Sequence, residues 1–290
     1  MTTSNTAQVV GLERDADAYL DTIGREASLA HIMSRDVKLT WWLLAINVVF
    51  WVGAKFYGLL VFVPDTDIST AVYNAEQLVF YTGMKVNVHI EAGQWWRLWT
   101  SQFVHLDILH ILFNGYGLFI LGPILERFYG ARRLFVLYVL SGTIASLSSY
   151  YFNAVPSGGA SGAIYGLVGG LLVFGYKYRK MLPARVSKAL TVGLMPWVVL
   201  GLGIGFLDGI PMDNAAHLGG LISGALITLV LASRLKPHRH PATSHVIWVL
   251  AAGALGALIW SAAAWSGELS ECVSDRAAYE QCYPELKARL

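Results

Sequence analysis

Seven long apolar stretches constrain this chain more than any other feature of its sequence. Each is close to the ~20 residues that a helix needs to cross the hydrocarbon core of a bilayer. Only 14% of the 290 residues are charged, against roughly a quarter in a soluble domain. The sequence therefore predicts an all-α polytopic membrane protein. The stretches lie at about 39–63, 103–122, 133–152, 161–176, 187–207, 214–233 and 245–265.

The charge balance and the N-terminal segment narrow the functional classes. The formal net charge is +2, and no basic patch stands outside the loops between spans, which argues against a nucleic-acid partner. The segment before the first span is polar and acidic and lacks the apolar core of a signal peptide. Its apolar residues fall near a helical period, so we expect either a short amphipathic helix or a solvated arm. They are Leu12, Tyr19, Leu20, Ile23 and Ala27.

Lysine and arginine gather in alternate loops, and this bias sets the orientation. The loops after the second, fourth and sixth spans are basic, so we expect them to be cytoplasmic, with the N-terminus inside and the C-terminus outside. The charge bias and compact loops suit a bacterial inner membrane. The basic residues are Arg127, Arg132 and Arg133, then Lys177, Arg179, Lys180, Arg185 and Lys188, then Arg234, Lys236 and Arg239.

These features divide the chain into four predicted parts. Residues 1–38 form a cytoplasmic extension, and residues 39–235 form a six-span core with a long first loop at 64–100. Residues 236–266 hold a cytoplasmic loop and the seventh span, and residues 267–290 form an extracytoplasmic tail. Both cysteines, Cys272 and Cys282, lie in this tail, where an oxidising environment would favour a disulfide between them. Their spacing does not suit zinc.

The first loop ends in two tryptophans followed by an arginine. We expect this loop to lie in or on the outer leaflet, because an indole suits the membrane interface and a guanidinium can reach a lipid phosphate. The residues concerned are Trp95, Trp96 and Arg97.

Polar side chains inside a bilayer are costly and mark function by default. Ser161, His217 and His110 lie about 16, 17 and 16 residues before the next cytoplasmic charge, which places all three at about 24–25 Å from it in helical geometry. Three polar groups on three spans therefore fall at one depth. No cluster of ligands indicates a metal, and no cofactor is expected.

Helical spacing also predicts which of these residues share a face. His110 and Asn114 are four apart and face the same way, as do Ser161 and Tyr165. His105 and His110 would point about 140° apart in a continuous helix, which disfavours a metal site built from them.

A close approach of two spans would bring Ser161 and His217 together. The fourth and sixth spans carry small residues at intervals that allow membrane helices to pack tightly, although such residues also occur in plain helix packing. His217 could then act as a base for the Ser161 hydroxyl, with Tyr165 orienting the imidazole. No acidic third member is expected, because Asp213 is placed in a loop and in water. The seam residues include Gly166, Gly169, Gly170, Gly219, Gly220, Ser223 and Gly224.

The motifs together resemble the rhomboid family of intramembrane proteases. The family's Trp-Arg motif is present as Trp96-Arg97, and its span-two pattern as His105, His110 and Asn114. Its Gly-x-Ser-Gly motif is present at Gly159–Gly162, and its span-six pattern at His217, Gly220 and Gly224. The motifs cover roughly residues 93–224, and a seventh span resembles the family's six-plus-one arrangement.

The resemblance implies a role for each matching residue. Ser161 would be the nucleophile and His217 the general base, with His110, Asn114 and the Ser161 backbone N–H forming an oxyanion hole. Tyr165 would stack on His217, and His105 would be structural. Glu126 and Arg127 are adjacent here, where many members separate this pair by one residue. We expect them to tie together the loop between spans two and three.

The substrate predicted by this interpretation is a transmembrane segment of another protein, cut at a locally unwound site, with a small residue before the cut. Three alternatives remain. An inactive rhomboid-like protein would bind membrane clients without cutting them, although this chain keeps both Ser161 and His217. A transporter would use buried His and Asn to line a path, but no internal repeat is evident. A metal-dependent membrane enzyme lacks a supporting motif.

Overall fold

The computed structural model describes residues 2–62, 83–207, 212–235, 241–272 and 281–282. In this part of the chain the regular elements are all helices, joined by loops, with one isolated antiparallel bridge between Lys85 and Ser157, so the predicted all-α architecture is confirmed. The helices are α1 (Thr2–Met33), α2 (Leu39–Phe62), α4 (Asn87–Glu91), α5 (Arg97–Thr100), α6 (Ile108–Tyr129), α7 (Ala131–Phe152), α8 (Ser161–Lys177), α9 (Ala184–Leu190), α10 (Met195–Ile204), α11 (Asn214–Val230) and α12 (Pro241–Cys272).

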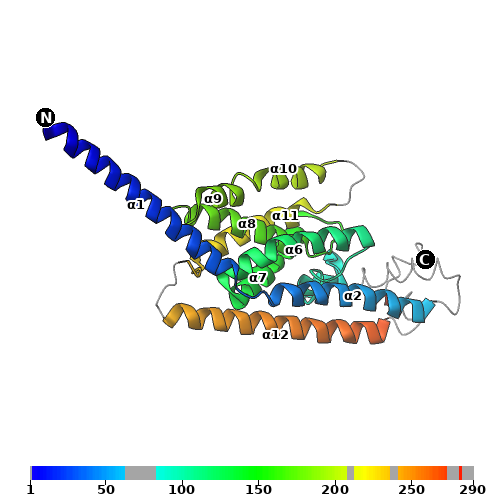
Figure 1. The fold of residues 1–290 in the computed structure, drawn as a ribbon. Coiled ribbons are helices and arrows are strands. Elements are labelled where there is room, and N and C mark those ends of the chain that lie inside the picture. Colours follow the sequence, from blue (N-terminus) through cyan, green and yellow to red (C-terminus); the bar gives the residue numbers. More distant parts are fainter. Residues whose placement is uncertain (1, 63–82, 208–211, 236–240, 273–280, 283–290) are drawn as a thin grey trace.

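Helix α8 lies inside the bundle, and α7 and α11 pack against it (Figure 1). Glycines bring the backbones of α8 and α11 into contact. A Cβ atom at Gly220 would overlap the carbonyl oxygen of Gly162, and one at Gly224 would overlap that of Gly166. Such small residues allow membrane helices to approach closely. The first turns of α8 and α11 are consequently held side by side.

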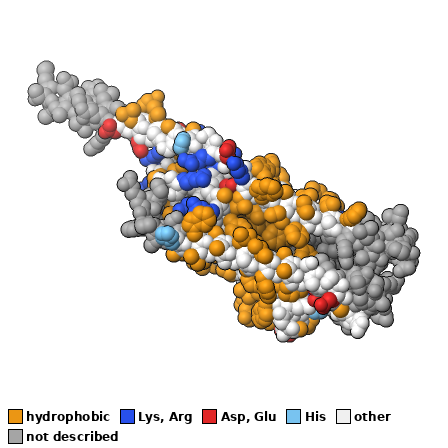
Figure 2. Space-filling view, turned by 90° about the horizontal axis from the view of Figure 1, so that it is seen from below, with side chains coloured by type: hydrophobic (Ala, Val, Ile, Leu, Met, Phe, Trp, Pro, Cys, Tyr) orange, Lys and Arg blue, Asp and Glu red, His pale blue; other side chains and the backbone are white. Residues whose placement is uncertain are grey.

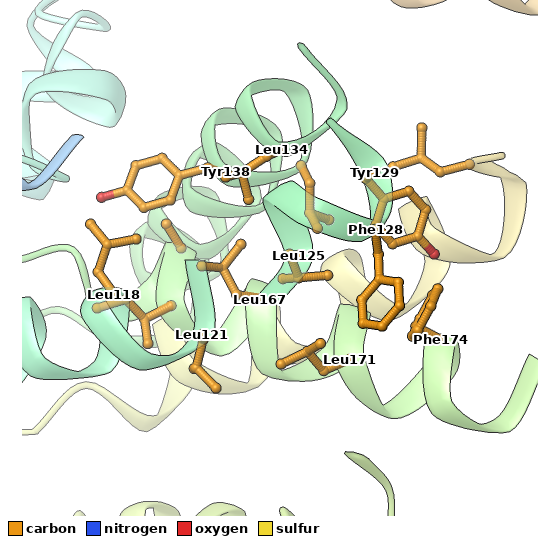
Figure 3. Packing of buried hydrophobic residues seen from close by; sticks show 14 of the residues in the cluster. Leu118, Leu121, Leu125, Phe128, Tyr129, Leu134, Tyr138, Leu167, Leu171 and Phe174 are labelled. Carbon is orange, nitrogen blue, oxygen red and sulfur yellow. The ribbon is translucent and has the colours of Figure 1, made fainter. Parts of the chain in front are cut away.

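A layer of buried leucine and aromatic side chains packs α6, α7 and α8 together (Figure 3). Leu125 of α6, Leu134 of α7 and Leu171 of α8 are fully buried in it. At the basic end of the bundle, the ring centroids of Phe128 and Phe174 are 4.2 Å apart. Because interiors of this kind are close-packed, the layer fixes the depths of the three helices relative to one another.

The outer surface of the bundle is apolar. Phe113 of α6 and Trp197 of α10 are 75% and 71% exposed. Figure 2 shows apolar side chains over the middle of the molecule and Lys and Arg gathered near the base of α1. Four helical stretches among the described residues are long and apolar enough to cross a membrane, and two shorter stretches, Leu39–Gly53 of α2 and the whole of α11, are also apolar. This is the surface of an integral membrane protein.

The helices observed do not keep all the predicted bounds, and two of the differences have a clear physical reason. The second was expected at 103–122, but α6 begins at Ile108, because the Asp107 side chain accepts a hydrogen bond (2.9 Å) from the backbone N–H of His110 and caps the helix there. The fifth, expected at 187–207, is divided into α9 and α10 by a turn. Pro196, in the first turn of α10, has no N–H to donate and so suits a helix start.

The N-terminal segment is helical, as one of the two sequence interpretations has it. Helix α1 runs out from the bundle in Figure 1. At its C-terminal end, Ile32 is buried, and Leu29 and Met33 pack against the core. Further towards the N-terminus, Tyr19 and Leu20 are more than 60% exposed.

Candidate active site

Ser161 and His217 face each other across the contact between α8 and α11. The Oγ atom of Ser161 lies 2.9 Å from Nε2 of His217, within hydrogen-bonding distance. Ser161 is the first residue of α8, and His217 lies in the first turn of α11, where it is 3% exposed. The glycine contacts between the two helices explain why two residues far apart in the sequence meet.

Tyr165 packs flat against the His217 ring. The ring centroids are 4.3 Å apart and the planes differ by 12°. Tyr165 follows Ser161 by one helical turn, so both side chains reach His217 from α8. This arrangement restricts rotation of the imidazole, which keeps Nε2 directed at the serine.

In the part of the chain that the structure describes, no carboxylate lies within hydrogen-bonding distance of the other imidazole nitrogen. Within the described residues, Nδ1 of His217 has no hydrogen-bond partner. Asp213, which the sequence placed in water, is partly buried and caps α11 by accepting a hydrogen bond (3.0 Å) from the N–H of Ala216. Its other oxygen accepts a hydrogen bond from the Ser149 hydroxyl. The predicted placement of Asp213 in water was wrong, because its carboxylate binds a free N–H group at the start of α11 and is partly buried there.

His110 and Asn114 converge on the backbone just before Ser161. Gly159 has φ +115°, a conformation that favours glycine. A Cβ at this position would lie 2.5 Å from Nε2 of His110 and 3.3 Å from Nδ2 of Asn114. Two side chains that can donate hydrogen bonds therefore approach the chain two residues before Ser161, next to the uncapped N–H groups at the start of α8. Such a group of donors can stabilise a negatively charged oxygen.

His105 lies closer to His110 than the sequence predicted. The two rings are 5.1 Å apart in an edge-to-face arrangement, because His105 precedes the start of α6 and does not follow its helical geometry. Nε2 of His105 accepts a hydrogen bond (3.3 Å) from the N–H of Ala160, and Nδ1 lies 3.3 Å from the carbonyl of Phe103. His105 thus contacts the residue before the serine. Among the described residues there is no group of three potential metal ligands.

Arg97 does not reach towards lipid, contrary to the sequence-based expectation. Its side chain is fully buried, donates to the Met84 carbonyl (3.0 Å) and Oε1 of Gln94 (2.6 Å), and faces Glu268 of α12 at 3.9 Å. A guanidinium has five donors in a fixed fork, and here it binds the first loop and faces α12. Trp96 is buried beside it, while Trp95 is 46% exposed.

Glu126 and Arg127 act on the start of α2 rather than only on the loop between α6 and α7. The carboxylate of Glu126 accepts hydrogen bonds of 2.8–2.9 Å from the backbone N–H groups of Lys38, Leu39 and Thr40. Arg127 donates to the Arg35 carbonyl (3.3 Å). The first N–H groups of a helix lack partners within the helix, so a carboxylate from a neighbouring helix caps them. Sequence spacing could not reveal this contact.

A small polar cavity lies behind Ser161 and was not predicted from the sequence. Its volume is about 20 Å³, near that of a single water site. Apart from the residues of the Gly-x-Ser-Gly motif, no sequence motif marks the lining, because it comes from loops and from the serine-rich α7. The residues include Lys85, Ser101, Gln102, Ser146, Ser149, Ser157 and Gly162.

Comparison with known proteins identifies a family model and several relatives that match this part of the chain. The family model described as the Rhomboid domain matches residues 92–234. Rhomboid protease GlpG of Haemophilus influenzae is 32% identical over 179 residues, which cover 59% of this chain and 90% of that protein. Rhomboid protease AarA of Providencia stuartii is 29% identical over 246 residues, which cover 77% of this chain and 82% of that protein.

A third relative is longer than the shared region. Rhomboid protease GluP of Bacillus subtilis is 39% identical over 151 residues, which cover 52% of this chain and only 29% of GluP. The likeness to GluP is therefore confined to less than a third of that protein. In this chain, the Rhomboid domain match includes Ser161, His217, His110 and Asn114.

Proposed function

Because the chain belongs to the rhomboid family, we propose that it is an intramembrane serine protease in which Ser161 and His217 form a catalytic dyad. The observation that carries this proposal is the 2.9 Å separation of Ser161 Oγ from His217 Nε2 within an apolar bundle. A serine hydroxyl is a weak nucleophile that needs a base within hydrogen-bonding reach, and an imidazole can take and return the proton.

The proposed reaction begins with attack of Ser161 Oγ on a peptide carbonyl while His217 Nε2 takes the hydroxyl proton. The carbonyl oxygen becomes negatively charged as the C–O bond to serine forms. His110, Asn114 and the Ser161 N–H would stabilise this charge, each at about 2.7–4 kcal/mol if they resemble measured donors of this kind. His217 then gives its proton to the leaving nitrogen, and a water molecule releases the acyl group by the reverse sequence.

The proposed substrate is a transmembrane segment of another membrane protein. A helix hides its peptide carbonyls in internal hydrogen bonds, so the segment must unwind near the cut, and Gly, Ala or Ser would make this easier. The cavity of about 20 Å³ beside Ser161 supports a small side chain before the cut.

The proposal is tested by comparing the purified parent with Ser161→Ala and His217→Ala on a generic single-span substrate. Each variant should lose at least about 10³-fold in kcat, since nucleophile and base act as a unit. A serine-reactive phosphonate should label the parent and not Ser161→Ala. Ser261→Ala and His245→Ala are matched controls, because Ser261 bonds to Ala257 O within α12 and His245 is exposed.

Three results would contradict the dyad. Cleavage that survives Ser161→Ala would require another nucleophile. Loss of activity with a chelator would favour a metal-dependent enzyme. A folded parent that binds the substrate but neither cleaves it nor reacts with the phosphonate would favour an inactive client-binding protein.

A further inference from the structure

The ammonium group of Lys85 is surrounded by the backbone of the loop that leads to Ser161. The residue is 1% exposed. Its Nζ atom donates to the carbonyl oxygens of Asn153 (2.7 Å) and Val155 (2.8 Å) and to Oδ1 of Asn87 (3.0 Å). Two of its three acceptors thus belong to the connection between α7 and α8.

The backbone of Lys85 binds the same connection further along. Its N–H donates to the Ser157 carbonyl (2.8 Å), and its carbonyl accepts from the Ser157 N–H (3.0 Å). Gly159 N–H then donates to the Ser101 carbonyl (2.7 Å), two residues before the nucleophile. The loop is therefore fixed at every second residue, and Lys85 supplies the contacts at Asn153, Val155 and Ser157.

The segment that carries Lys85 is itself anchored on its other side. Arg97 donates to the Met84 carbonyl (3.0 Å), and the Thr100 hydroxyl donates to the Gly83 carbonyl (2.7 Å). Both donors belong to α5 and both are buried. Lys85 thus links the loop before α8 to a segment that α5 holds in place.

The charge on Lys85 strengthens this contact. Burial lowers the pKa of Lys85 to about 8, and the nearby Asp213 carboxylate opposes this shift. The amine therefore stays mainly protonated at neutral pH, and hydrogen bonds from a charged donor are roughly twice as strong as neutral ones. Loss of the donor would remove the hydrogen bonds that hold the Asn153 and Val155 carbonyls to the buried Lys85 side chain.

We propose that Lys85 is a positioning residue that fixes the 153–160 loop and thereby sets the place of Ser161 relative to His217. The inference rests on the proposed protease function. Lys85 also lines the cavity beside Ser161, so movement of its side chain would alter the same space. It takes no part in bond making or breaking. A displacement of Ser161 by about 1 Å would be enough to lower the rate by about 100-fold.

Lys177 offers a matched control within the same chain. Its Nζ atom also donates to three backbone carbonyls, those of Thr228 (3.2 Å), Leu229 (2.6 Å) and Leu231 (3.1 Å). It lies at the far end of α8, about 24 Å along the helix from Ser161. Lys177→Met therefore removes a comparable set of hydrogen bonds without touching the loop before Ser161.

The test measures phosphonate labelling of Ser161, kcat and KM, and the unfolding midpoint of full-length Lys85→Met, Lys177→Met and the parent. Lys85→Met should label about 10- to 100-fold more slowly and lose kcat in proportion, with KM unchanged. Lys177→Met should keep the parent labelling rate even if its unfolding midpoint falls as far. Equal labelling of Lys85→Met and parent, or an equal loss in Lys177→Met, would overturn the inference.

The outcomes separate this inference from the function on which it rests. A parent that is neither labelled nor active contradicts the protease itself, whereas an active parent with an unaffected Lys85→Met contradicts only the role of Lys85. If Lys85→Met does not fold, Asn87→Ala is used instead, because it removes one of the three acceptors of Lys85 together with the hydrogen bond (2.9 Å) that Asn87 donates to the Tyr150 carbonyl at the end of α7. Asn87→Ala should then show a smaller loss of labelling, and a parent-like rate would reject the proposal.

Discussion

The imidazole of His217 is held from two directions by residues of a single helix. Ser161 meets its Nε2 atom at 2.9 Å, and Tyr165 covers its ring face at 4.3 Å between centroids. In the proposed mechanism, the first contact would allow proton transfer and the second would orient the imidazole ring. The two can be separated experimentally because a phenyl ring can replace the phenol without losing the stacked surface.

We predict that Tyr165→Phe keeps close to parent activity and that Tyr165→Ala lowers kcat by up to about tenfold. Aromatic pairs are worth about 0.5–1.5 kcal/mol beyond their burial, and without the ring the imidazole would rotate more freely. Cleavage of a single-span substrate, with both unfolding midpoints recorded, checks this. Equal activity of the two variants would remove the orienting role.

Helix geometry was enough to predict that Ser161 and His217 could meet. Ser161, His110 and His217 were placed at one depth by counting residues along three spans, and the structure brings Ser161 and His217 within hydrogen-bonding distance. The reasoning was wrong for Arg97, which was assigned to the lipid interface and is buried. Its partners Met84 and Glu268 come from other segments, and single-residue preferences carry no information about such contacts.

At the scale of helices, the contact between α8 and α11 depends on the absence of side chains. The backbone oxygen of Gly166 occupies the place that a Cβ of Gly224 would need. Such crowding involves main-chain atoms on both sides, so neither helix can yield by changing a rotamer. The glycines therefore act together as one packing surface.

We predict that Gly224→Ala lowers the free energy of unfolding by about 1–3 kcal/mol, the usual cost of overpacking. Gly203→Ala in α10 is the matched control, because nothing lies within 4 Å of its Cβ position. Since alanine favours helix over glycine by about 1 kcal/mol, the control should be neutral or slightly stabilised. The measurement is thermal unfolding of both variants in the same detergent. Equal unfolding midpoints for the two variants would contradict the packing argument.

Element boundaries were predicted less well than the elements themselves. Long apolar runs indicated α7 and α11 because length and hydrophobicity suffice to identify a span. The break between α9 and α10 was missed, since the run from 187 to 207 stays apolar across the turn. The role of Lys85 was also missed, because a loop residue has no periodicity that would show what it contacts.

At the scale of the whole molecule, the proposed topology places the N-terminus in the cytoplasm and the C-terminal tail outside. Lys and Arg lie near the base of α1 in Figure 2, which supports this orientation. Cys282 is disulfide-bonded in the structure, and Cys272 is the only other cysteine of the chain. Both facts support the proposed pairing, and an oxidising compartment would maintain it. The proposed division at residues 38, 235 and 266 follows the same topology.

One labelling experiment tests both the topology and the disulfide. We predict that a membrane-impermeant maleimide added to intact bacterial cells leaves the chain unlabelled, and that it adds two labels after mild reduction from outside. Labelling without reductant would mean free thiols. Absence of labelling in reduced intact cells, followed by labelling after lysis, would place the tail in the cytoplasm.

The main-chain contact between α8 and α11 has a consequence for variation among proteins of this architecture. The close approach of α8 and α11 depends on contacts between carbonyl oxygens and α-carbons, in which no lipid-facing side chain takes part. The lipid-facing side chains can then be substituted to suit a thicker, thinner or more fluid bilayer, while Ser161 and His217 keep their separation. Substitutions that suit the surface to another membrane need not change the separation of Ser161 and His217.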